Sequence, residues 1–237
     1  AKAAEAEAIL TRCGTDGVDA VADQFTRART VAERATLRAL LDRLPAADAG
    51  LTAMLADTRP ATSRIAEELL GERRSLDGDR ALADQLTAGD FRVRRAVVRA
   101  LGQYDTPFSI EAIGRVIDDP VVEVRLEAVA ALSRTKGAKV VGDIVGRAID
   151  REEDPEVQAG MLGVLGRVAT ADAVAKLAKA AEAGSGLFAS RKGVALRVAA
   201  VRALGEARTP GARTALTALA NDKEREVRDA VAKAIGR

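Results

Sequence analysis

The sequence predicts an all-α protein in which pairs of helices stack on one another as a solenoid. A short phrase recurs five times: an aliphatic residue, usually followed by Arg, and Leu-Gly or a close variant eight positions after the aliphatic residue. The phrase begins at positions 93, 124, 157, 196 and 227, at intervals of 31, 33, 39 and 31 residues. A period of this length is typical of stacked helix pairs, each of which contacts only its neighbours.

The second half of each repeat predicts a second helix. An aliphatic residue stands twelve positions after each repeat Leu: Leu82, Ile113, Ile144, Leu177 and Leu216. In the first helix, the aliphatic positions share one face, and the position before the Leu is mostly Ala, which allows a neighbouring helix to approach closely. These patterns predict about seven helix pairs and a terminal helix.

Capping residues and glycines mark the expected helix ends. Asp119-Pro120 and Asp154-Pro155 each place a capping side chain before a proline at the first helical position. The glycines of the repeated phrase are expected in left-handed helix termini: Gly102, Gly166 and Gly205.

The repeat weakens toward the start of the chain. Residues 4–13, 18–25, 31–44 and 51–56 still have the spacing of amphipathic helices. We therefore expect a single solenoid domain over residues 1–237, with degenerate repeats at 1–58 and regular repeats at 59–237.

Residues 119–125, Asp-Pro-Val-Val-Glu-Val-Arg, precede an Ala-rich run and resemble the short bacterial HEAT repeats, a group also called phycobilisome-lyase HEAT-like. The resemblance is strong from about residue 60 onward. It implies a right-handed α-α superhelix that acts as a non-catalytic scaffold for protein-protein interaction or for assembly of a larger complex. Ankyrin and tetratricopeptide arrays have similar periods, but their turn and aromatic patterns are absent.

The composition argues against common catalytic and metal sites. The chain has no His and one Cys, so it offers no Ser-His or Cys-His nucleophile and no zinc ligand set. Pairs of acidic residues fall in turns or at helix starts, where negative charge favours the helix dipole. We therefore expect no enzyme activity, no cofactor and no metal. Cys13 is expected to fill the core and to indicate a reducing, cytoplasmic setting, and no apolar run is long enough to enter a membrane as a helix.

Two other function classes stay open at this point. Because the repeats resemble those of bilin lyases, an accessory or catalytic subunit of a lyase-type enzyme is one alternative. A nucleic-acid-binding HEAT-like protein is the second. Against it stand a net charge of only +2, 2% aromatic residues and the lack of a basic stripe on the second helices. We expect the partner to be another protein or a further segment of the same longer chain.

The Arg of the repeated phrase and the acid before it are interpreted as structural. The residues concerned are Arg94, Arg125, Arg197 and Arg228, with Asp90, Asp119 and Asp222. A turn Asp that accepts hydrogen bonds from backbone amides and from the Arg of an adjoining repeat makes a charge-assisted ladder. Such a ladder fixes the angle between layers.

The repeat from residue 154 to 182 departs from the pattern, and we predict the binding site there. It carries Gln158 in place of the repeated Arg and three glycines on one helical stripe, and it is followed by the insertion 184–193. Loops that interrupt a repeat often hold binding residues. The candidate partner-binding residues are Gln158, Gly160, Gly163, Leu187, Phe188, Arg191 and Lys192. Folding of Leu187 and Phe188 back between the layers is an equally weighted alternative.

The last predicted helix, residues 226–235, keeps the apolar residues Val227, Val231 and Ile235. We expect these side chains to face neighbours on both sides. On that reasoning, Arg237 is either a truncation point within a longer protein or an end that packs against a partner.

Overall fold

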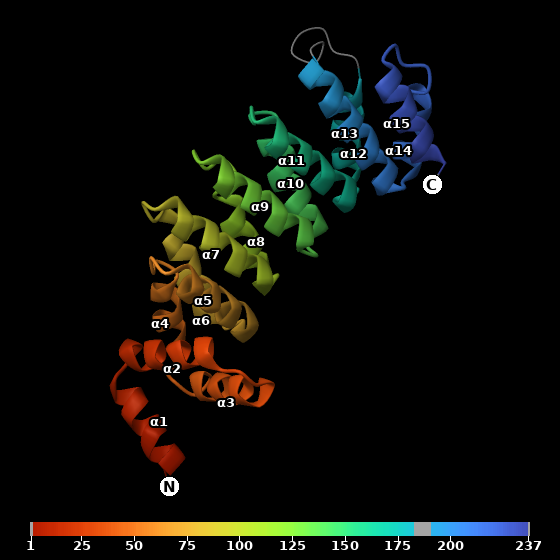
Figure 1. The fold of residues 1–237 in the computed structure, drawn as a ribbon. Helices are drawn as coiled ribbons and strands as arrows, with labels where there is room; N and C mark the ends of the chain where they lie inside the picture. Colours follow the sequence, from red (N-terminus) through yellow and green to blue (C-terminus); the bar gives the residue numbers. More distant parts are fainter. Residues whose placement is uncertain (1, 183–190, 237) are drawn as a thin grey trace. The chain divides into compact units, whose positions relative to one another are not determined.

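The computed structural model describes residues 2–182 and 191–236 of the chain. This part contains fifteen α-helices, one short 3-10 helix and no strand (Figure 1). The predicted all-α class is therefore confirmed, and the number of helices agrees with seven pairs and a terminal helix. The chain divides into two compact units, Ala1–Ala112 and Ile113–Arg237. The prediction of a single domain stays a prediction.

The N-terminal unit begins with the degenerate repeats. Its helices lie close to the segments expected from the sequence, although their ends differ by several residues. They are α1 (Lys2–Arg12), α2 (Thr15–Arg27), α3 (Val31–Leu41), α4 (Ala47–Met54), α5 (Pro60–Arg73), α6 (Leu76–Asp84), η1 (Gln85–Thr87) and α7 (Phe91–Tyr104). The next helix, α8 (Pro107–Gly114), spans the boundary between the two units.

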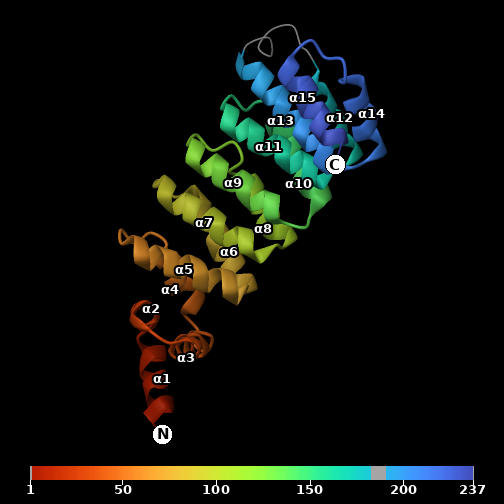
Figure 2. The same ribbon diagram turned by 45° about the vertical axis from the view of Figure 1, so that its right-hand side comes forward.

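The C-terminal unit consists of regular helix pairs. They are α9 (Val122–Arg134), α10 (Ala138–Ala148), α11 (Pro155–Val168), α12 (Ala171–Ala181), α13 (Arg191–Ala207), α14 (Pro210–Ala218) and α15 (Arg225–Ile235). The first helices of successive repeats, α9, α11, α13 and α15, pack against one another in one layer (Figures 1 and 2). The second helices, α10, α12 and α14, pack in the other layer. We call these the first-helix layer and the second-helix layer.

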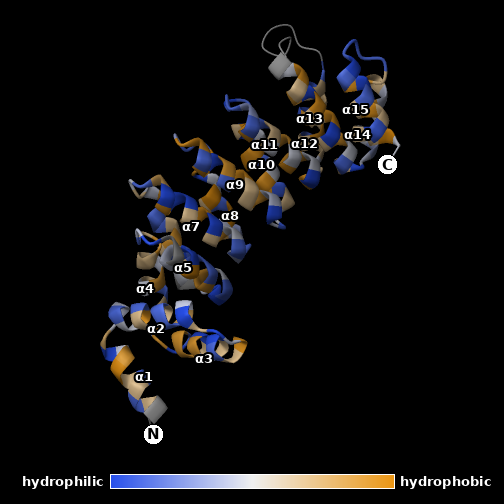
Figure 3. Cartoon of the chain, viewed as in Figure 1, coloured by the Kyte–Doolittle hydropathy of each residue, from blue (hydrophilic) through white to orange (hydrophobic). Residues whose placement is uncertain are grey.

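The core is formed by the repeated aliphatic positions. Leu70, Leu101, Leu132, Leu165 and Leu204 are buried. The predicted second-helix residues are buried as well: Leu82, Ile113, Ile144, Leu177 and Leu216. Hydrophobic and hydrophilic stretches alternate along the helices, as amphipathic helices require (Figure 3).

The glycines of the repeated phrase do not end their helices, so the prediction of left-handed termini at these residues was wrong. Left-handed backbone occurs three residues later, at Arg74, Asp105, Ala169 and Arg208, with φ between 47 and 52°. The glycines lie inside helices, and two of them permit close packing instead. A Cβ added at Gly166 would lie 2.5 Å from the carbonyl oxygen of Ala203, and one at Gly205 would lie 2.8 Å from the Cβ of Ala234. The small residue before the repeat Leu, or before Ile235 in α15, thus packs against the glycine of the preceding repeat.

The two predicted Asp-Pro caps differ in outcome. Asp154 caps α11, since its side chain accepts hydrogen bonds from the backbone amides of Glu156 and Val157. Helix α9 begins only at Val122, and the carboxylate of Asp119 instead accepts from the amide of Val121 in the preceding turn. Asp119-Pro120 therefore forms the turn before the helix and not its first residues.

Cys13 follows the end of α1 and is exposed, so its prediction as core filler was wrong. Val227 and Val231 of α15 are buried within the C-terminal unit, whereas Ile235 is 56% exposed. Of the three residues expected to face neighbours on both sides, only Ile235 is therefore exposed. Among the described residues, no helix is long and apolar enough to cross a membrane.

Candidate functional site

The predicted ladder is present in part. Arg197 pairs with the predicted Asp222, Arg125 joins the next repeat through Glu152 and not through a predicted acid, and Asp90 is bound by Arg92 of its own repeat. Arg125 of α9 donates from Nε and Nη2 to the two carboxylate oxygens of Glu152, at 2.7 and 3.0 Å. Glu152 lies in the loop before α11 and also accepts from the amides of Glu153 and Asp154. Two parallel charge-assisted hydrogen bonds fix both the distance and the orientation of the two successive repeats.

A second joint of the same kind connects α13 to the loop before α15. The guanidinium of Arg197 donates to Asp222, and the side chains of the two residues are only 3% and 8% exposed. Arg197 also donates to the carbonyl of Ala181 at 2.9 Å. Burial alone would raise the pKa of Asp222, but hydrogen bonds from Arg197 and from the amide of Glu224 lower it below its usual value. The ionised pair is therefore favoured in the folded protein.

The repeated Arg has a further recurrent contact within its own repeat. Three of the four side chains donate to the backbone carbonyl six residues before them: Arg94 to Ala88, Arg125 to Asp119 and Arg228 to Asp222. Gln158 makes the same contact with the carbonyl of Glu152. The exceptional Gln158 is therefore a structural substitute for Arg and points into the turn.

The predicted glycine stripe of α11 serves more than one purpose. A Cβ at Gly160 would lie 3.0 Å from a methyl group of Val129, so this glycine faces α9. Gly166 packs against the backbone of α13, as described above. A Cβ at Gly163 would meet nothing within 4 Å. Of these residues, Gly163 alone faces open space.

The remaining candidate side chains, those of the insertion, lie outside the described residues. Leu187 and Phe188 lie outside the described residues. Arg191 and Lys192 begin the backbone of α13, but their side chains are likewise outside the description. Whether the insertion joins the predicted site stays a prediction.

An uncharged strip crosses the first-helix layer at Gly163. The strip consists of the second and sixth positions after the first aliphatic residue in α9 and α11, and of the second position alone in α13. All of these residues are partly exposed: Leu126 and Ala130 of α9, Ala159 and Gly163 of α11, and Val198 of α13. We call this set the apolar strip. Charge returns at the sixth position of α13, Arg202, and at both positions of α15, Asp229 and Lys233, where the strip ends.

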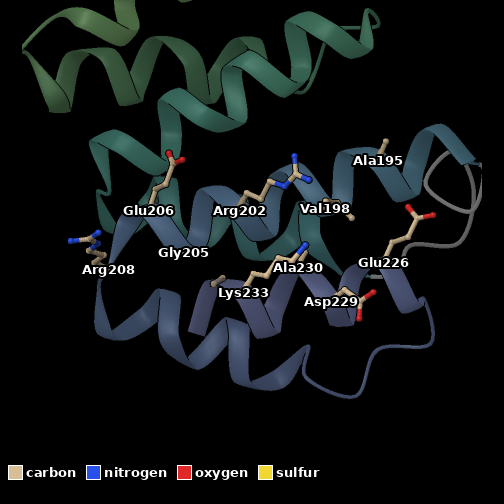
Figure 4. Close-up of a pocket in the computed structure, with 11 residues that line it drawn as sticks. Ala195, Val198, Arg202, Gly205, Glu206, Arg208, Glu226, Asp229, Ala230 and Lys233 are labelled. Atoms are coloured by element: carbon tan, nitrogen blue, oxygen red, sulfur yellow. The ribbon is translucent and has the colours of Figure 1, made fainter. Parts of the chain in front are cut away.

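The strip is continued by a groove of about 550 Å³ between α13 and α15 (Figure 4). Its walls include Val198 of the strip and small residues such as Ala195 and Ala230. Six charged side chains line it: Arg202, Glu206 and Arg208 from α13 and the residue after it, and Glu226, Asp229 and Lys233 from α15.

A second groove, of about 640 Å³, lies between α10 and α12 in the second-helix layer. Gly142 and Gly146 leave it open, although a Cβ at either position would find ordinary contact distances of 3.5 Å. Its charged residues are of both signs, and Lys176 is paired with Asp150 at 2.7 Å. The groove thus has no basic stripe, in agreement with the expectation from the sequence.

The N-terminal unit contains a buried polar cluster that the sequence analysis missed. Ser75, the N-cap of α6, donates to Asp48 of α4 at 2.6 Å, and Thr106, before α8, donates to Asp79 of α6 at 2.7 Å. Asp79 is 2% exposed and its Oδ1 has no partner among the described residues, as is also true of the hydroxyl of Tyr104. Burial raises the pKa of Asp79. It also raises the pKa of Tyr104, together with the nearby charges of Asp48 and Asp79. The only signal was an interval of 31 residues between Asp48 and Asp79 and between Ser75 and Thr106.

Comparison with known families agrees with this architecture. A family model described as HEAT repeats matches residues 48–133, 79–150 and 185–237, which together make up more than half of the chain. The chain belongs to the HEAT repeat family. No curated protein matches it. Within the described residues, no group of three or more acidic or Cys side chains has the arrangement of a metal site.

Three solved structures are similar to this chain at low identity and with TM-scores below 0.5. Human deoxyhypusine hydroxylase in complex with glycerol is 19% identical, with a TM-score of 0.40 over 95% of this chain and 96% of that chain. A designed armadillo repeat protein is 15% identical, with a TM-score of 0.43 over 78% and 97%. The complex of CpcE and CpcF of phycocyanin lyase from Nostoc sp. PCC7120 is 15% identical, with a TM-score of 0.34 over 90% and 94%. None of these likenesses carries an argument about function.

Proposed function

We propose that the chain is a non-catalytic scaffold that binds another protein through the first-helix layer of its C-terminal unit. HEAT repeats typically form protein-interaction scaffolds. The observation that carries the proposal is the apolar strip at Gly163. A glycine inside a helix lowers helix stability by about 1 kcal/mol relative to alanine. At Gly163 no neighbouring atom would clash with a side chain, so packing within the chain does not require glycine.

The strip differs from the surrounding surface in the way expected of an interface centre. The repeated arginines that could have made this layer polar are instead directed into turns and layer joints. Partly exposed, uncharged residues then remain on adjacent helices, with charged residues beyond them. Interfaces commonly combine an apolar centre, depleted of charge, with a polar rim.

Two finer statements belong to this proposal. The first is membership of the short bacterial, phycobilisome-lyase HEAT-like group, which residues 119–125 support by resemblance alone. The second is the absence of enzyme activity. No observation favours the lyase-subunit or nucleic-acid alternatives over protein binding.

The test replaces Gly163 by Arg, the residue type found at the same repeat position in Arg99 and Arg202. Because a side chain there meets open space, the melting temperature is expected to stay within a few degrees of the parent, whereas affinity for any protein partner falls. Ala175→Arg, at an exposed position of α12, is the matched control in the second-helix layer. Partner capture that is insensitive to Gly163→Arg but lost on Ala175→Arg would move the binding face to the other layer and contradict the proposal.

A further inference from the structure

The groove between α13 and α15 brings together two cations at equivalent positions of successive repeats. Arg202 and Lys233 are each the sixth residue after the first aliphatic residue of their repeat, and both are exposed. Figure 4 shows Arg202 projecting from α13 and Lys233 from α15 near the middle of the groove. Two like charges on opposite walls of one groove repel each other.

Neither cation has an ion-pair partner in the described part of the chain. The equivalent residue of α7 behaves differently, since Arg99 is paired with Glu67 of α5 at 2.9 Å. The helix dipole accounts for Lys233, which lies in the last turn of α15. It does not account for Arg202, which lies more than a turn before the end of α13, because the effect fades within the last turn.

Each cation has one acidic residue of the groove four positions away on its own helix, Glu206 for Arg202 and Asp229 for Lys233, although neither pair forms an ion pair in the described structure. Glu226 and Asp229 lie toward the start of α15, whereas Glu206 and Arg208 lie at the other end, near the end of α13 (Figure 4). Asp229 and Lys233 are four residues apart, which corresponds to about 6 Å along the helix axis. An extended chain covers that distance in about two residues.

The dimensions of the groove suit a chain segment. Its volume of about 550 Å³ falls within the range of ligand pockets in proteins. Ala195, Val198, Ala230 and Ala234 form much of its wall, and they leave room for a backbone between the two rows of charge. Val198 also belongs to the apolar strip, so an occupant of the groove would be continuous with a partner on the strip.

We propose that this groove binds an extended segment of a partner protein that carries an acidic and a basic residue two or three positions apart. The acidic side chain lies between Arg202 and Lys233, where it replaces a repulsion by two charge-assisted contacts. The basic side chain lies toward Glu226 and Asp229, of which Asp229 also pairs with Arg225 at 3.7 Å. The inference rests on the proposed scaffold function and adds the chemistry of the partner.

The experiment selects random dodecapeptides from a display library on the full chain and measures their affinity for the parent and for an R202E/K233E variant. Selected peptides are expected to carry the acid-base pair at the stated spacing and to lose about tenfold or more in affinity for the variant. Exchange of the acidic residue for Lys in such a peptide is expected to restore binding to R202E/K233E. Arg213→Glu, an exposed change on α14, serves as the control and is expected to leave affinity unchanged.

A single change guards against misfolding as the cause. Arg202→Gln removes the repulsion across the groove and keeps a long polar side chain on α13, so it is expected to leave the melting temperature nearly unchanged while it weakens peptide binding. Peptides that bind R202E/K233E as well as the parent overturn the groove inference. If the same peptides are lost on Gly163→Arg, the proposed function survives and the groove inference alone fails. If no peptide is enriched, the groove inference is overturned, while the partner-capture test decides the proposed function separately.

Discussion

Both units of this protein join successive repeats through ion pairs, but the N-terminal unit adds hydroxyl joints, and Asp48 there also pairs with Arg73 at 2.8 Å. In the C-terminal unit, an Arg of one repeat binds an acid in the next loop, as in Arg125 with Glu152 and Arg197 with Asp222. In the N-terminal unit, a hydroxyl before one second helix binds a carboxylate on the preceding second helix, as in Ser75 with Asp48 and Thr106 with Asp79. The first kind of joint lowers the pKa of Asp222, and the second leaves the pKa of Asp79 raised. One repeat architecture therefore tolerates joints with opposite electrostatic character.

The largest expected effect tests the charged joint. Asp222→Asn leaves the buried guanidinium of Arg197 without its carboxylate, and breaking a buried pair typically costs about 3–5 kcal/mol. Urea unfolding should show the loss. Hydrogen exchange should place it around α13 and α15 and leave the N-terminal unit protected. Asp229→Asn, at an exposed position of α15, is the control, and an equal loss in both variants would contradict a special role for the pair.

A smaller effect compares glycines of the two units. Gly166→Ala directs a methyl group at the backbone of Ala203, which is expected to cost about 1–3 kcal/mol through overpacking. In Gly71→Ala of the N-terminal unit, the three atoms nearest to the new methyl group all belong to the exposed side chain of Gln103, which can turn aside. Thermal unfolding of the two variants is therefore expected to separate them. A loss for Gly71→Ala as large as that for Gly166→Ala would show that both units need the glycine equally.

The smallest effect tests the hydroxyl joint through pH. Because the folded pKa of Asp79 is raised above its usual 3.8, its protonated form favours folding, and that contribution is lost as pH rises through the folded pKa. Asp222 has the opposite sign: its contribution is present above 3.8 and is lost as pH falls through its lowered folded pKa. Asp79→Asn keeps an acceptor for Thr106 and removes the buried charge. It is therefore expected to raise stability at pH about 7, by less than the losses expected for the two variants above.

Urea midpoints measured at pH about 4 and about 7 check this expectation. The difference between the two pH values should change on Asp79→Asn and stay unchanged on Asp84→Asn, an exposed position of the same helix. If the Asp79→Asn variant keeps the pH dependence of the parent, Asp79 ionises in the folded state as easily as in the unfolded one.

The sequence predicted the fold well because its period reports directly on burial. The aliphatic positions and the Arg ladder follow from spacing, and Arg197 with Asp222 matches the predicted joint. Glycine positions were harder, because a glycine one turn before a helix end satisfies both a capping pattern and a packing pattern. Only the position of Ala203 against Gly166 distinguishes the two uses.

The candidate site was predicted only in part. Gly163 was identified because it broke the repeat, whereas Gln158 broke it without changing the contact that it makes. The groove between α13 and α15 followed the repeat and therefore gave no anomaly to notice. The cluster around Asp79 escaped because a hydroxyl and a carboxylate 27 residues apart are ordinary in sequence and become a pair only through stacking.

The left-handed backbone at Arg74, Asp105, Ala169 and Arg208 affects the stability of the individual repeats. A residue other than glycine in this conformation costs about 1–2 kcal/mol. The cost is incurred at the ends of α5, α7, α11 and α13 but not at the end of α9, where Thr135 is extended with φ of −77°. Each repeat that carries it offsets it only through contacts with its immediate neighbours. A repeat with a single neighbour has the fewest stabilising contacts to offset this strain. Local unfolding is therefore expected to begin at such a repeat.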